Sequence, residues 1–159
     1  MGEITMSQAE DLFLRYHQGL PYVARVTVQV QPDPSGPRIL LDCVGTGFSS
    51  QGSAEEATTT GCKDWKQGAE AGARHALRTA AQEQSLVFIL RINGLSTDTN
   101  PTIVGAAAMK AVWQALGYSP FSGEVERIEQ IVLGSWQQPY DFIPDFAAAE
   151  GGSASFHTS

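Results

Sequence analysis

The sequence predicts an α+β fold, a two-layer sandwich in which helices cover one face of a mostly antiparallel, four-stranded sheet. Residues 24–31 alternate apolar and polar side chains, as a half-buried strand does, and residues 85–92 are apolar on both faces, as in a central strand. Residues 64–82 and 101–116 repeat apolar side chains at helical spacing. The chain has 159 residues, which fits one domain, and we assign residues 1–149 to it.

The first element is expected to be an amphipathic helix over residues 5–19. Gly19 and Pro21 would end it. Its inner side would consist of apolar residues at helical spacing: Met6, Ala9, Leu12, Phe13 and Tyr16.

A β-hairpin is expected next, because two strand-like runs flank a turn-rich segment. The runs are residues 24–31 and 38–44, and the sequence QPDPSGP between them is dense in turn-forming residues. Polar residues alternate along the first run, so one face of this sheet should contact water.

Residues 45–61, GTGFSSQGSAEEATTTG, are small, polar and rich in glycine. We interpret them as a long flexible loop with one helical turn at Ala54–Ala57, and loops of this length are often functional. A phosphate-binding loop would need a helix that opens inside the glycine motif, but here the long helix begins only after Gly61, and no Lys–Ser/Thr pair follows the glycines. The sequence therefore favours a loop over a nucleotide site.

A helix over Asp64–Gln82 begins the second half of the chain. Small and apolar residues form its inner stripe. Its other side carries a charged ladder at i, i+4 steps, which we expect to face solvent: Lys66, Glu70, Arg74 and Arg78.

A strand, a turn and a second helix follow. The Asn-Gly pair at 93–94 should form a tight turn after the strand of residues 85–92. Asn100 can cap a helix whose first residue is Pro101, and Gly117 would end that helix.

The chain is expected to finish with a strand, an extension and a tail. Residues 124–136 begin charged and end apolar, which favours a last strand. Residues 137–149 form a C-terminal extension with two aromatic patches, and residues 150–159 should be disordered.

Composition argues against several classes of function. The formal net charge is −7 with ten basic residues, and nucleic-acid affinity depends on neutralising phosphates, so general nucleic-acid binding is disfavoured. No apolar run approaches 18 residues, so no membrane span is expected. The N-terminus lacks the pattern of a signal peptide, which makes a cytoplasmic location the default. Cys43 and Cys62 should be small buried or partly buried residues rather than a disulfide framework.

No constellation of catalytic residues stands out. His75 has no acid three or four residues away, although a catalytic histidine needs an orienting partner. Asp42, Asp64 and Asp98 are scattered acids, and Asp98 most simply belongs to the start of the second helix. No histidine, cysteine or carboxylate pair has the spacing of a zinc site, so neither a metal nor a cofactor is expected.

Three stretches resemble domain IV of elongation factor G, of the superfamily named after the second domain of a small-subunit ribosomal protein. They are VARVTVQVQP, DWKQGAEAGARHALR and LVFILRINGLSTDTNPTIVGAAAMKAVWQAL, within a core of residues 22–136. The resemblance implies the order strand, strand, long loop, helix, strand, tight turn, helix, strand. It also implies a left-handed βαβ crossover, an exception to the usual hand.

The same comparison argues against translocase activity. The family carries a histidine at the tip of the turn before its second helix, whereas this turn reads Leu95, Ser96, Thr97 and Asp98. The sequence HQGLPYVA replaces the family's glycine-rich approach to the first strand, and no GTPase domain is expected within these 159 residues. No functional residue of the family maps onto this sequence.

The helix of residues 101–116 is apolar on almost every side, and such a helix is normally buried. Met109 and Trp113 lie towards a side that the sheet would not cover. The N-terminal helix, the sequence YDFIPDF or a second protomer could cover them. The leading hypothesis is therefore a non-catalytic module that self-associates or docks on a protein or ribonucleoprotein partner.

Two alternatives stay open. One is a small enzyme or ligand-binding protein with its site under the loop of residues 45–61, using Asp42, Asp64 or His75. The other is a ribosome-associated factor that contacts RNA through basic residues at the start of the predicted helix Asp64–Gln82 and along it: Lys63, Lys66, Arg74 and Arg78.

Overall fold

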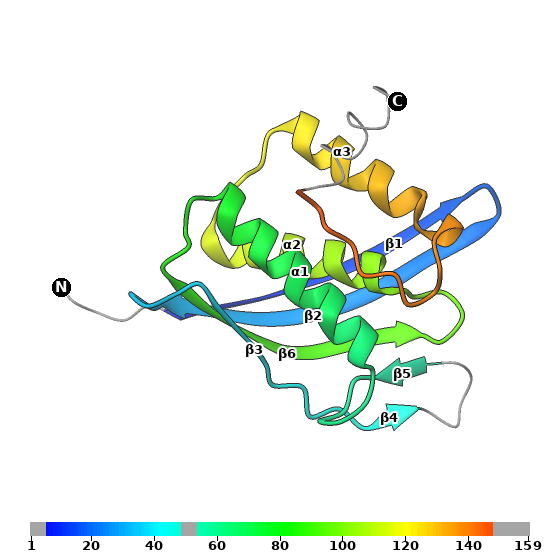
Figure 1. Ribbon diagram of the computed structural model, residues 1–159, viewed down its shortest axis with the longest axis horizontal. Helices are drawn as coiled ribbons and strands as arrows, with labels where there is room; N and C mark the ends of the chain where they lie inside the picture. Colours follow the sequence, from blue (N-terminus) through cyan, green and yellow to red (C-terminus); the bar gives the residue numbers. More distant parts are fainter. Residues whose placement is uncertain (1–5, 49–53, 148–159) are drawn as a thin grey trace.

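The computed structural model describes residues 6–48 and 54–147, and its helices lie on one face of a mostly antiparallel sheet (Figure 1). This confirms the predicted fold class, but the described sheet has six strands rather than four. The strand order is β1-β2-β6-β5-β4, and β3 also pairs with β6. The elements in chain order are β1 (Ser7–His17), β2 (Leu20–Pro32), β3 (Arg38–Leu41), β4 (Gly47–Phe48), β5 (Ala54–Glu56), α1 (Lys63–Thr79), β6 (Ser85–Leu95), α2 (Pro101–Leu116), α3 (Ser122–Leu133) and a 3-10 turn (Ser135–Gln137).

The predicted N-terminal helix of residues 5–19 is wrong, because β1 pairs antiparallel with β2 along its whole length. Gln18 and Gly19 have φ values of 54° and 79°, which form the two-residue turn that suits a twisted hairpin. The apolar residues of this segment fit a strand as well as a helix. Pairing with β2 decides between them.

The predicted hairpin of residues 24–31 with 38–44 is also wrong. β2 lies between β1 and β6, and β3 pairs in parallel with β6. The turn-rich run instead carries the chain past the start of β6, where the Asp33 amide donates to the Gln84 carbonyl at 3.0 Å. β3, α1 and β6 therefore form a βαβ unit, and the left hand of this crossover stays a prediction.

The loop of residues 45–61 contains strand structure where one helical turn was predicted. β5 pairs antiparallel with β4 and with the end of β6. The pair at 93–94 continues β6 instead of turning, because β2 and β5 pair with it on both sides. The chain turns after β6, where the Asp98 amide donates to the Leu95 carbonyl at 2.9 Å.

Both predicted inner helices are confirmed as α1 and α2. The Asn100 side chain accepts from the Ile103 amide, Pro101 begins α2, and Gly117 ends it with a φ of 68°. The predicted strand of residues 124–136 is wrong, since residues 122–133 form α3. Ile128 and Val132, four residues apart, are its buried residues, which is helical rather than strand periodicity. The predicted disordered tail of residues 150–159 lies outside the described residues.

The apolar helix α2 is covered within the chain. It packs against β1 and β2 on one side and against α1 and α3 on others, and α1 and α2 lie next to each other over the sheet (Figure 1). Trp113 is 3% exposed and Met109 is fully buried. The cover comes mainly from α1 and the sheet, whereas the N-terminal segment that was expected to help as a helix is part of that sheet.

Candidate functional site

The four predicted catalytic candidates do not converge. Asp42 is exposed just after β3, and Asp64 lies in the first turn of α1. Asp98 lies in the turn before α2, where Asn100 rather than Asp98 caps the helix. Of the four, His75 alone has a carboxylate partner among the hydrogen bonds of the described residues.

That partner is Glu124 of α3. The Nε2 atom of His75 is 2.7 Å from Glu124 Oε2, and the Arg127 Nη2 donates to the same oxygen at 2.9 Å. Arg127 also donates to the Phe146 carbonyl at 2.6 Å, and the Phe146 ring lies 6.1 Å from the His75 ring. His75 is 5% exposed, and its Nδ1 is buried without a hydrogen bond to described residues. This cluster joins α1, α3 and the C-terminal segment, and its burial suits a structural contact.

The charge state of Glu124 makes this contact dependent on pH. Burial raises the pKa of Glu124, but hydrogen bonds from Arg127 and His75, with their charges, bring it below its ordinary value of 4.5. A carboxyl group whose pKa falls on folding stabilises the folded state above its unfolded pKa. That stabilisation is lost as the pH falls through the folded pKa.

We expect Glu124→Gln to lower the free energy of unfolding by about 1–3 kcal/mol at pH 7, because it removes the carboxylate charge that the buried His75 and the partly buried Arg127 share. The difference from the wild type should shrink as the pH falls below 4.5. Urea unfolding between pH 7 and pH 3 measures both. Glu70→Gln is the control, because its exposed pair with Arg74 is worth at most about 0.5 kcal/mol. If the difference in the free energy of unfolding between the wild type and Glu124→Gln stayed constant over this pH range, the charge of Glu124 would not stabilise the fold as stated.

The basic ladder predicted on α1 is not a continuous exposed stripe. Lys66 is only 8% exposed, contrary to the expectation that the ladder faces solvent. Arg74 is exposed and pairs with Glu70 at 3.0 Å, and Arg78 is exposed. Burial of Lys66 follows from its position between Trp65 and Ala69, which both face the interior.

The two predicted apolar interaction residues are core residues. The Trp113 indole Nε1 donates to Thr79 Oγ1 of α1 at 3.0 Å, and its ring lies 6.1 Å from that of Tyr118. Met109 is fully buried as well. Both side chains are packed inside the described part of the chain, and a contact of either with a partner stays a prediction.

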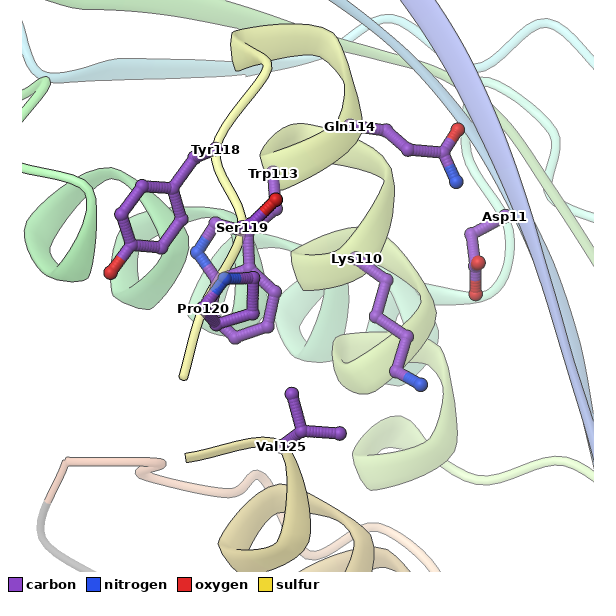
Figure 2. A pocket seen from close by; sticks show the side chains of 8 residues that line it. All are labelled: Asp11, Lys110, Trp113, Gln114, Tyr118, Ser119, Pro120 and Val125. Carbon is purple, nitrogen blue, oxygen red and sulfur yellow. The ribbon is translucent and has the colours of Figure 1, made fainter. Parts of the chain in front are cut away.

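A hollow of about 290 Å³ lies between β1, α2 and the start of α3 (Figure 2). Asp11 and Lys110 form its polar side, and Trp113 and Pro120 lie on the opposite side. Burial raises the pKa of Asp11, although the nearby positive charges of Lys110 and Arg15 act to lower it. Neither a histidine nor a second carboxylate lines this hollow. The sequence did not reveal it, because a helix was predicted where β1 lies.

A second hollow, of about 410 Å³, lies beside the start of α1 and includes Asp64, Tyr140 and Cys62. Burial, with a contact from Glu55, raises the pKa of the Cys62 thiol to about 12, so this sulfur is not a ready nucleophile. Both cysteines are free, Cys43 is buried and Cys62 is partly buried, close to expectation.

The outward face of β1 carries three large apolar side chains that are exposed: Leu12, Leu14 and Tyr16. We call Gln8, Glu10, Leu12, Leu14 and Tyr16 the outer row, because these residues alternate with Phe13, which faces α2, and all five are exposed. Leu12, Leu14 and Tyr16 are 47%, 50% and 78% exposed. The period-two spacing of these residues was a signal in the sequence that the helical interpretation passed over.

Two further searches of the described residues were negative. Within residues 6–48 and 54–147, no group of three or more histidine, cysteine or acidic side chains is placed to hold a metal ion. Over the same residues, no helix combines the length and the apolar character needed to cross a membrane.

Comparisons with known proteins add a likeness of fold. No protein family matches the chain, and no curated protein does. A crystal structure of ttk003000868 from Thermus thermophilus matches with a TM-score of 0.56 and 11% sequence identity. The match covers 71% of this chain but 16% of that protein, so the chain spans a small part of its length. At this identity the likeness concerns the fold alone.

Proposed function

We propose that the chain is a non-catalytic protein-interaction module that binds through β1. The observation that carries the proposal is the outer row, in which Leu12, Leu14 and Tyr16 are about half exposed or more. The helix side of the sheet is already covered by α1 and α2. A row of large apolar side chains beside polar ones is typical of a contact surface.

The partner that this surface fits is an extended strand of a polypeptide. Among the described residues, β1 pairs with β2 alone, so its other edge has backbone groups without strand partners. An added strand gains main-chain hydrogen bonds at such an edge, and alternate side chains provide specificity.

The enzyme and ligand-binding alternative has weaker support. Asp64 lines a hollow, but Asp42 and His75 do not line it. The cluster around His75 is mostly buried, and its hydrogen bonds join α1, α3 and the C-terminal segment to one another.

A fold like domain IV of elongation factor G also remains our proposal. The order β2, β3, α1, β6, α2 supports it, while α3 stands where the resemblance implies a strand. A role on the ribosome draws less support from the charges, because Lys66 is buried and Arg74 is paired with Glu70.

The proposal predicts a site-specific contact at Tyr16. A photo-crosslinking amino acid in place of Tyr16 should give a discrete adduct when the full chain is irradiated in its native cells. The same amino acid in place of Arg78, which is exposed on α1, is the matched control and should give none. Leu14→Pro removes one edge amide and should abolish the adduct at position 16. Absence of an adduct at Tyr16, or an equal one at Arg78, would overturn the proposal.

A further inference from the structure

The free edge of β1 presents the backbone groups of the outer row. His17 and Leu20 flank a two-residue turn and oppose each other, and in such hairpins the flanking pair exchanges both backbone hydrogen bonds. Hydrogen-bonded pairs recur at every second residue of an antiparallel ladder, so after His17 they fall at Arg15 and then at Phe13. The amide and carbonyl groups of Phe13 therefore point towards β2. Those of Leu12 and Leu14 therefore point away from β2, to the free edge.

The sequence of β1 is complementary to itself about Phe13. If two copies of β1 lie antiparallel with Phe13 opposite Phe13, Leu12 of one copy lies opposite Leu14 of the other. Asp11 then lies opposite Arg15, and this charge pair occurs twice by symmetry. Cross-strand pairs of apolar residues and of opposite charges both stabilise a sheet.

Neighbouring registers lack this match. A centre at Leu12 places Asp11 opposite Phe13, and a centre at Leu14 places Arg15 opposite Phe13. A shift by one residue would bring outer-row side chains to the helix face, which a sheet does not allow. The centre at Phe13 is therefore the register that the side chains select.

We infer that the strand added to β1 is β1 of a second copy of this chain, paired antiparallel about Phe13 with Asp11 opposite Arg15. This inference rests on the proposed function and names its partner. The two sheets become one continuous sheet through the interface.

Both residues of the charge pair lie on the edge strand β1. Arg15 Nη1 donates to the Leu14 carbonyl at 3.0 Å, while its other nitrogens hold Glu129 at 2.7 and 3.2 Å. Asp11 Oδ2 is buried without a hydrogen-bond partner among the described residues. In the paired state the amide of Leu12 from the second copy donates to the Leu14 carbonyl. Arg15 Nη1 is then released to reach Asp11 of that copy.

Charge reversal with mixing tests the inference. Asp11→Arg alone places like charges opposite each other, and so does Arg15→Asp alone, so each variant should dimerise at least about tenfold more weakly than the wild type. An equimolar mixture of the two should recover the dimer. In the mixed dimer the introduced arginine of one chain faces the introduced aspartate of the other, and the retained Arg15 faces the retained Asp11. Sedimentation equilibrium of the full chain gives the masses, and Glu70→Arg and Arg74→Glu, reversals on α1, are controls that should leave the mass unchanged.

Disulfide trapping provides a second measurement if a charge variant does not fold. A mixture of Leu12→Cys with Leu14→Cys should form an intermolecular disulfide much faster than either variant alone, with the wild type as the control for Cys43 and Cys62. A wild-type monomer at all concentrations, or a dimer unaffected by both charge variants, would overturn the inference. If position 16 were still crosslinked to a different polypeptide, the proposed function would stand, and only the inference that the partner is a second copy would fail.

Discussion

Gly72→Ala is expected to lower the free energy of unfolding by about 2 kcal/mol or more, although alanine is the better helix former. A Cβ at position 72 would overlap the backbone carbonyl of Gly105 in α2, and one at Gly68 would overlap that of Pro101. These glycines allow α1 and α2 to approach backbone to backbone. A methyl group there must push the two helices apart, because backbone atoms cannot rotate away as a flexible side chain can.

The gain in helix propensity is about 1 kcal/mol, which is smaller than the cost of the overlap, so Gly72→Ala should lower the free energy of unfolding. Urea or thermal unfolding of the wild type and Gly72→Ala measures the difference. Gly134→Ala is the matched control, since a Cβ there meets its nearest atom, the Gln130 carbonyl oxygen, at 3.6 Å and φ is −95°. It should stay within about 0.5 kcal/mol of the wild type. A Gly72→Ala protein as stable as this control would show that the two helices do not pack through glycine.

The elements that the sequence predicted well are those with local signals. Asn100, Pro101 and Gly117 mark both ends of α2, because capping depends on residues within one turn of the helix. β6 was recognised as a central strand because both of its faces are apolar, and β2 and β3 do lie on its two sides. Such signals do not depend on what the rest of the chain does.

The elements that were predicted wrongly from the sequence depend on strands that lie far from them along the chain. Phe13 is buried against α2 whether its segment is helix or strand, and the backbone of β2 decides in favour of strand. The turn-forming residues before β3 are real, but turn chemistry cannot say which strand β3 will join. The pair at 93–94 has the composition of a turn, yet β2 and β5 hold it in an extended conformation.

Partners that are distant in the sequence were missed at the candidate site as well. The sequence disfavoured His75 as a base because no acid lies near it in the chain, whereas its acidic partner, Glu124, comes 49 residues later from a helix that was predicted to be a strand. The apolar character of α2 was interpreted as a need for cover beyond the sheet, from another segment of the chain or from a second protomer. Its partners are α1 and the sheet, so the case for association now rests on Leu12, Leu14 and Tyr16.

Trp113→Ala should therefore act on stability, with an expected loss of about 3–5 kcal/mol in the free energy of unfolding. The indole is 3% exposed, and removing it leaves a cavity between α1 and α2 and takes away the hydrogen bond to Thr79 Oγ1. Because domains of this size are stable by about 5–15 kcal/mol, this variant should be close to unfolding at physiological temperature. Chemical denaturation followed by far-UV circular dichroism measures the change.

Tyr16→Ala is the counterpart, because Tyr16 is 78% exposed in the outer row. It should change the free energy of unfolding by no more than about 0.5 kcal/mol while weakening association. Trp113→Phe keeps most of the volume and should lose less than Trp113→Ala, which separates the cavity from the lost hydrogen bond. If instead Trp113→Ala kept the wild-type unfolding midpoint and abolished association, α2 would be the contact surface, and β1 would lose its claim to that role.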